Sequence, residues 1–195
     1  MGQMPHALEL FRKAAAAHPD DVDILLEGAS ALLEHGSVQE AVEWYQKAII
    51  LQPDNPSLHL GLGTALEAKG AGAEAIVALR KAVELEPSDE VAWCELGNAL
   101  LRGGQEREAA GCFDAALGID DAYEAAWVGK ARAVARLKGP KAAVKYVDVA
   151  LSLSLGFPEA LALRDELVGR VPRRDAPAME PAQETAAQAP VGELA

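Results

Sequence analysis

The chain has 195 residues and a formal net charge of −12 at pH 7; 50% of its residues are hydrophobic and 5% are aromatic. Alanine and leucine dominate and β-branched residues are scattered, which favours helices over strands. The negative charge argues against a general nucleic-acid partner, because such a protein needs a basic face to displace phosphate counterions.

The first predicted element, residues 1–21, is a single helix. Its pattern returns further along the chain, where Ala41 and Tyr45 take the places of Ala7 and Phe11. It therefore corresponds to the second helix of a repeat whose first helix is missing, and its apolar face lacks a partner. We expect either that the chain is cut from a longer array or that this face packs against another copy or another protein.

Three segments of equal length follow, at 22–55, 56–89 and 90–123. A regular step of this size is typical of stacked helical repeats. Small residues recur where two helices can approach closely, and glycines recur where the first helix of a segment must end in left-handed backbone. The recurring positions are Ala29, Gly63 and Gly97; Gly36, Gly70 and Gly104; Ala41, Ala75 and Ala109; and Ala48, Ala82 and Ala116.

The second helix of each of the first two segments is expected to stop at Pro53 and Pro87, because proline has no amide hydrogen to donate. The fourth segment, residues 124–157, is a degenerate copy of the same pattern. Lys130 stands where leucine belongs, and the proline is missing.

The C-terminal region is predicted to contain a helix and a tail. Pro158 can start a capping helix over residues 158–170, which would cover the open apolar end of the stack. Residues 171–195 are rich in Pro, Ala, Gln and Glu and are predicted to be disordered, because they cannot bury enough apolar surface.

These recurring residues resemble the tetratricopeptide repeat (TPR) family, whose unit is two antiparallel helices in about 34 residues. The resemblance implies an all-α fold. It would be an α-α superhelix, a right-handed solenoid of antiparallel helix pairs, closed by the C-terminal capping helix.

The resemblance also implies a peptide-binding groove on the concave side, lined by the first helix of each repeat. The fifth, ninth and twelfth repeat positions are spaced i, i+4 and i+7, which places them on one stripe of the helix. The groove residues implied in this way are Leu26, Ser30 and Leu33; Leu60, Thr64 and Glu67; Cys94, Asn98 and Leu101; and Val128, Arg132 and Ala135.

Two binding modes known for the family are not expected here. The clamp that grips the C-terminal carboxylate of heat-shock chaperones uses Lys, Asn and Arg, but Leu26 and Ser30 stand at its early positions. A ladder of groove asparagines is not expected either, because Asn98 is the one asparagine in the stripe.

Charge is distributed unevenly along the array. Residues 22–55 contain one basic and six acidic residues, whereas residues 124–157 contain six basic and two acidic residues. We predict that Arg102, Arg132 and Arg136, near the groove, attract an acidic segment of a partner. The alternatives are that these charges are merely solvated, or that the chain's own acidic tail folds back onto them.

No cofactor, metal or catalytic site is predicted. The four histidines lack the spacing of metal ligands: His6 and His18 lie in the first segment, and His35 and His59 lie in the two that follow. The stretch GLGTALEAKG contains Gly-x-Gly but follows a proline turn rather than a strand, so it is weak evidence for a nucleotide site. Neither a nucleophile elbow nor a His-Glu-x-x-His motif is present, and we expect no enzyme activity.

The cysteines and the N-terminus suggest a cytoplasmic chain. Cys94 and Cys112 are too few for a disulfide framework, so we expect free thiols in a reducing compartment. The N-terminus has no secretory signal, and no stretch approaches the roughly 18 apolar residues of a membrane span, so membrane insertion is not expected.

The sequence therefore predicts a protein-protein interaction scaffold or adaptor that holds a peptide or protein segment in its groove. The alternative is a substrate- or partner-recruiting segment of a larger enzyme or of an assembly or secretion machine, which the truncated first repeat favours. A homo-oligomer formed through the unpaired N-terminal helix is a further alternative.

Overall fold

The computed structural model describes residues 4–170, and every regular element in this range is an α-helix. The all-α fold expected from the sequence is confirmed, while the tail predicted from residue 171 onward lies outside the described residues. The helices are α1 (Met4–Ala17), α2 (Val22–Glu34), α3 (Val38–Leu51), α4 (Pro56–Lys69), α5 (Gly72–Leu85), α6 (Glu90–Arg102), α7 (Glu106–Ile119), α8 (Glu124–Lys138), α9 (Pro140–Leu153) and α10 (Pro158–Arg170).

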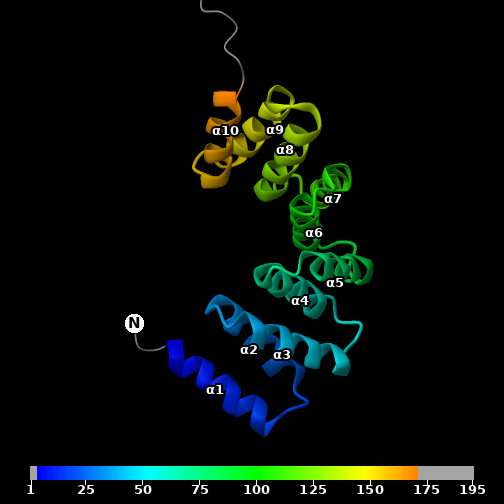
Figure 1. Ribbon diagram of the computed structural model, residues 1–195, viewed down its shortest axis with the longest axis vertical. Helices are drawn as coiled ribbons and strands as arrows, with labels where there is room; N and C mark the ends of the chain where they lie inside the picture. The colour runs from blue at the N-terminus through cyan, green and yellow to red at the C-terminus, as the bar shows by residue number, and fades with distance from the viewer. Residues whose placement is uncertain (1–3, 171–195) are drawn as a thin grey trace, which may run out of the picture.

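The helices stack in chain order along an arc, with α1 at one end and α10 at the other (Figure 1). Each helix packs against the next one in the chain, and α2, α4, α6, α8 and α10 also contact one another in series. In Figure 1, α4 and α6 lie toward the inner side of the arc, whereas α5 and α7 lie toward the outer side. This is the architecture of a helical solenoid, in which each repeat contacts only its neighbours.

Small residues allow the helices to approach closely. Ala41, Ala75 and Ala109 are completely buried. A Cβ atom added to Gly63 would lie 2.5 Å from the Leu79 side chain, so a larger residue has no room there. The sequence pattern of small residues therefore marks real contacts between helices.

The turn inside each repeat uses a glycine with positive φ, as the sequence predicts. Gly36, Gly70 and Gly104 have φ angles of 78°, 83° and 74°. In the fourth repeat the glycine is displaced by one residue, to Gly139, and α8 is 15 residues long. The degenerate repeat thus keeps a glycine with positive φ but shortens the turn to this one residue, between Lys138 and Pro140.

The turns between repeats are tied by ring nitrogens. Trp93 donates from Nε1 to the carbonyl of Pro87 at 2.9 Å, and Trp127 donates to the carbonyl of Asp121 at 2.8 Å. The ring of His59 makes the same contact, with Nε2 2.7 Å from the carbonyl oxygen of Pro53. Leu25 and Leu161 occupy this repeat position at the first and last turns, and a leucine side chain has no hydrogen to donate.

Candidate functional site

The predicted groove stripe lies on α2, α4, α6 and α8, but not all of it is accessible. Leu26, Leu33 and Leu60 are partly exposed and offer apolar surface. Three of the remaining fifth and twelfth positions differ: Cys94, Leu101 and Val128 are only 1%, 4% and 2% exposed. These three side chains belong to the core and have almost no surface to offer a ligand. The small side chain of Ala135 is partly exposed.

The ninth repeat position is polar in every repeat. The Ser30 hydroxyl donates to the carbonyl of Leu26 at 3.1 Å and lies 2.9 Å from the Tyr45 hydroxyl. Thr64 likewise donates to the carbonyl of Leu60 at 3.1 Å. These hydroxyls are therefore largely satisfied within their own repeats.

The side chain of Asn98 is less fully hydrogen-bonded within the protein than the hydroxyls of Ser30 and Thr64. Its Nδ2 lies 3.9 Å from the Cys94 sulfur, a long and weak contact, so the amide retains donor and acceptor capacity. Arg132 occupies the ninth position of the next repeat and is exposed. It makes no hydrogen bond or ion pair with any residue between 4 and 170.

The three predicted arginines are not equivalent. Arg102 forms an ion pair with Glu67, the twelfth residue of the preceding repeat. Arg136 donates to the carbonyl of Leu101 at 2.5 Å and lies 3.9 Å from Glu106. Two of the three guanidinium groups are thus engaged within the protein, while Arg132 retains its full hydrogen-bonding capacity.

Two carboxylates lie beside Arg102. Burial raises the pKa of Glu95, while the charge of Arg102 acts to lower it and that of Glu67 to raise it further. One oxygen of Glu67, Oε1, is buried and lacks a hydrogen-bond partner among the described residues. Arg102 is therefore paired with Glu67, and its charge also acts on the nearby carboxylate of Glu95.

Lys130, which the sequence marks as a departure from the repeat, is held by a cluster that sequence reasoning did not predict. Its ammonium group pairs with Asp114 and lies 5.0 Å and 5.5 Å from the ring centroids of Tyr146 and Trp127. The two rings stack with centroids 6.3 Å apart. The cation is thus stabilised at a position that leucine would otherwise fill.

The free cysteines have no features of a reactive site. Burial raises the pKa of Cys94 to about 12 and that of Cys112 to about 11, which disfavours the nucleophilic thiolate. Between residues 4 and 170 no three His, Cys, Asp or Glu side chains gather as metal ligands would. The Gly-x-Gly of the sequence, Gly61 and Gly63, lies inside α4 and packs against Tyr45 and Leu79.

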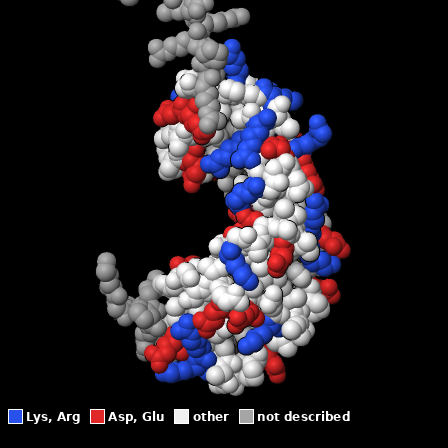
Figure 2. Space-filling view, in the orientation of Figure 1, with Lys and Arg blue, Asp and Glu red and all other residues white. Residues whose placement is uncertain are grey.

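The surface of the arc is hollowed on one side, and basic side chains gather over α8 at the edge of this hollow (Figure 2). Arg132 and Arg136 belong to α8, and both are exposed. The N-terminal half of the stripe, in contrast, contains no basic side chain: it has three leucines, two hydroxyl side chains and the acidic Glu67. The basic side chains of the groove therefore lie toward its C-terminal end.

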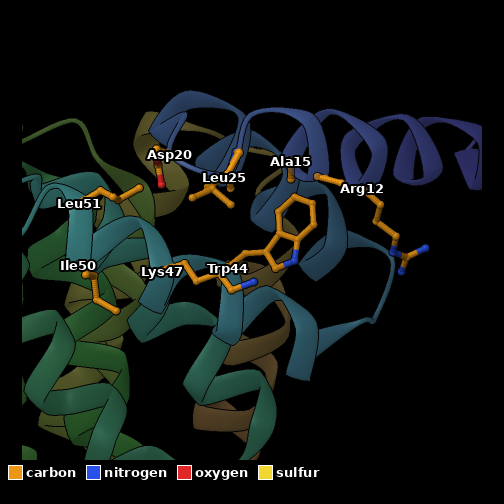
Figure 3. Close-up of a pocket in the computed structure, with 10 residues that line it drawn as sticks. Arg12, Ala15, Asp20, Leu25, Trp44, Lys47, Ile50 and Leu51 are labelled. Atoms are coloured by element: carbon orange, nitrogen blue, oxygen red, sulfur yellow. The ribbon is translucent and has the colours of Figure 1, made fainter.

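A second hollow lies between α1, α2 and α3, outside the groove. It is an open cleft of about 510 Å³, and its walls include Leu25, Trp44 and Ile50 (Figure 3). The sequence did not predict it. Its Arg12 is paired with Glu40, with an N–O distance of 2.6 Å, and this pair lowers the pKa of Glu40.

None of the helices between residues 4 and 170 combines the length and the apolar character that crossing a membrane requires.

Solved structures of known proteins share this fold. The chain resembles MamA from Desulfovibrio magneticus RS-1 with 21% identity and a TM-score of 0.72, covering 80% of this chain and 89% of that one. It resembles YrrB, described as a TPR protein with an unusual peptide-binding site, with 23% identity and a TM-score of 0.70, covering 84% of both chains. The thermophilic TPR protein TTC0263 of Thermus thermophilus gives 21% identity and a TM-score of 0.68, covering 86% of this chain and 90% of that one.

Sequence families identify the repeat independently of the structure. A TPR repeat family matches residues 29–70, and two tetratricopeptide repeat families match residues 56–99 and 94–154. No match was found among curated proteins. The regular step of the sequence, the stacked helix pairs and these matches agree, and the chain is a member of the tetratricopeptide repeat family.

Proposed function

We propose that the chain is a protein-interaction scaffold that holds an extended segment of a partner in its concave groove and binds an acidic residue of that segment at Arg132. The single observation that carries this proposal is the unpaired guanidinium of Arg132 on the inner stripe. Tetratricopeptide repeat proteins generally act as scaffolds rather than enzymes, and YrrB, which shares the fold, has a peptide-binding site.

The length of the groove fits a short peptide. Neighbouring packed helices lie about 8–10 Å apart, so the three steps from α2 to α8 span about 24–30 Å. An extended chain advances about 3.3–3.6 Å per residue, so about eight residues would cross all four first helices.

The groove also suggests the order of residues in the partner. Leu26, Leu33 and Leu60 would contact apolar side chains, and Arg132 would bind a carboxylate through two parallel hydrogen bonds. Asn98, one repeat away at the same position, is suited to a backbone amide or carbonyl of the segment. The partner would thus be apolar at one end and acidic at the other.

Charge reversal at Arg132 tests the proposal. Arg132→Glu should weaken binding of an acidic partner at least about tenfold, because it replaces an attractive contact with a repulsive one. Arg107→Glu is the matched control, since Arg107 is exposed on the second helix α7 and the substitution makes the same change in net charge.

The measurement is fluorescence polarisation on a library of labelled octapeptides that vary in charge and apolar content. Wild type and Arg107→Glu should prefer acidic-apolar peptides, with an affinity that falls as salt rises. Equal binding by Arg132→Glu would reject the role of Arg132, while no binding of any peptide would reject the groove itself.

Self-association through α1 is the second candidate. Leu10 is 53% exposed. Phe11 is only partly buried, whereas the residues at the position of Phe11 in two other repeats, Leu79 and Phe113, are completely buried. Light scattering should show a mass that rises with concentration in wild type and in Val77→Glu, a control at an apolar side chain 68% exposed on α5, but not in Leu10→Glu. A wild-type chain that stays monomeric at high concentration would contradict this candidate.

A cytoplasmic location fits two thiols that remain free of a disulfide. Fractionation of cells that express the tagged chain would test it.

A further inference from the structure

The two ends of the repeat array lack the ring that ties each internal turn. At the three internal turns the fourth residue of the repeat is His59, Trp93 or Trp127, and its ring nitrogen meets the carbonyl of the preceding turn. At the first and last turns this residue is Leu25 or Leu161. No side chain between residues 4 and 170 donates to the carbonyl of Pro19 in the first turn.

An open space lies beside each of these two leucines. The α1–α3 cleft, about 510 Å³, is lined by Pro19 and Leu25, and a second cavity of about 320 Å³ is lined by Leu155 and Leu161 at the same repeat positions. Two repeats further along the chain, Pro87 and Trp93 take the places of Pro19 and Leu25. The cleft therefore corresponds in register to the surroundings of the Trp93 ring, although Trp44 and Ile50 stand where that repeat has Cys112 and Gly118.

The chemistry of the cleft matches a ring that carries a donor. Trp44 and Ile50 supply apolar walls, and Ile50 is 81% exposed (Figure 3). At the turn that follows α1, Pro19 and Asp20 line the cleft and supply a carbonyl and a carboxylate as acceptors, while the two basic lining residues are Arg12, which is paired with Glu40, and Lys47. A planar apolar group with one N–H complements both features.

We propose that the α1–α3 cleft is a docking site for a tryptophan side chain from a partner protein, separate from the groove. The ring would lie between α1 and α3, and its N–H would donate to the carbonyl of Pro19, as Trp93 does to Pro87. The chain's own residues 171–195 contain no aromatic residue, so they cannot supply this group. The cavity at Leu161 is less suited, because two of its lining side chains, Arg164 and Asp148, are paired at 3.1 Å.

The test uses the full chain and two synthetic pentapeptides, acetyl-Ala-Ala-Trp-Ala-Ala-amide and the same peptide with Phe at its centre. Titrations followed by amide and indole NMR signals should show the largest shifts at Asp20, Leu25 and Trp44. The Trp peptide should bind about fivefold more tightly than the Phe peptide, because a ring without a donor loses one hydrogen bond.

Leu25→Trp should fill the cleft from within, abolish these shifts and raise the thermal midpoint by about 2–4 °C. Leu161→Trp is the matched control, because it fills the cavity at the other end and should leave binding intact. Ile50→Ser tests the same site without risk to folding, since Ile50 is 81% exposed, and should weaken binding severalfold.

Three results would overturn the proposal: equal affinity for the two peptides, shifts that persist in Leu25→Trp, or shifts unchanged in Ile50→Ser. None of them bears on the groove, which is probed by Arg132 and acidic peptides.

Discussion

At the residue scale, ion pairs within the protein decide which charged side chains of the groove are free to bind a ligand. Arg102 forms an ion pair with Glu67, whereas Arg132 makes no contact of this kind with residues 4–170. An arginine bound to an internal carboxylate must lose that partner before it can bind a ligand, so the partnered arginine gains less from an acidic peptide. The proposed binding site for an acidic residue is thereby reduced from three candidate arginines to Arg132.

The partly buried carboxylate of Glu95 predicts a pH-dependent effect on stability. Because its pKa is raised in the folded state, its burial costs nothing while pH is below its unfolded pKa, and the cost develops as pH rises through the folded pKa. Glu95→Gln removes the charge and should therefore stabilise the protein at pH 7 by about 0.5–2 kcal/mol.

Urea denaturation at pH 7 and at pH 3.5 measures this difference. The gain from Glu95→Gln should shrink toward zero at the lower pH, where the wild-type carboxyl is protonated in both states. Glu86→Gln, at an exposed carboxylate in a turn, is the control and should change little at either pH. A gain of equal size at both pH values would show that charge is not its cause.

At the element scale, the sequence predicted most helices but not the reason why each one ends. Prolines were expected to stop α3 and α5, and both helices end two residues before the proline. Helices α7 and α9 end at the same repeat position, although Asp121 and Leu155 stand there instead of proline. Packing of each second helix between its neighbours therefore sets its length as much as the proline does.

Other features depend on contacts between side chains of different repeats, so the sequence of one repeat does not predict them. Lys130 departs from the pattern, and its partners Asp114 and Tyr146 come from the two neighbouring second helices. One recurrence was available in the sequence: the pairs Arg12–Glu40 and Arg80–Glu108 have the same separation along the chain, and both join successive second helices. A search for charge pairs at this spacing would have found them.

Helix packing predicts opposite effects for the same substitution at two glycines. A Cβ added to Gly129 would lie 2.2 Å from the ring of Phe113, so Gly129→Ala should destabilise the protein by about 1–3 kcal/mol. Gly111 is exposed in α7 with no atom within 4 Å of that position, so Gly111→Ala should stabilise it by about 0.8–1 kcal/mol through helix propensity. Chemical denaturation measures both changes, and effects of the same sign would refute this account.

At the scale of the whole molecule, stacking decides which predicted site residues reach solvent. The stripe was predicted from the periodicity of a single helix. That periodicity does not tell which residues the next helix pair covers. Curvature of the arc brings first helices together, and Cys94, Leu101 and Val128 are buried there. The clefts beside Leu25 and Leu161 have the same origin, since they are formed by side chains of successive helices and not by one helix alone.

Because each repeat contacts only its neighbours, damage at an end should remain local while damage at the centre should spread. Leu167 is 2% exposed in α10, which contacts only α8 and α9 among the described helices. Phe113 is fully buried and lies against Gly97 of α6 and Gly129 of α8, so it joins two consecutive repeats. Each truncation to alanine removes a large side chain, at a cost of about 2–5 kcal/mol for Leu167 and about 3–5 kcal/mol for Phe113.

Hydrogen exchange followed by mass spectrometry separates the two outcomes. Leu167→Ala should speed exchange in α10 and at the adjoining end of α9, while α4 to α7 keep their wild-type rates. Phe113→Ala should speed exchange throughout α6, α7 and α8, because opening at this point removes a neighbour from the helices on both sides. Uniformly faster exchange in Leu167→Ala would mean that the array unfolds as one unit, and the additive description of its repeats would then fail.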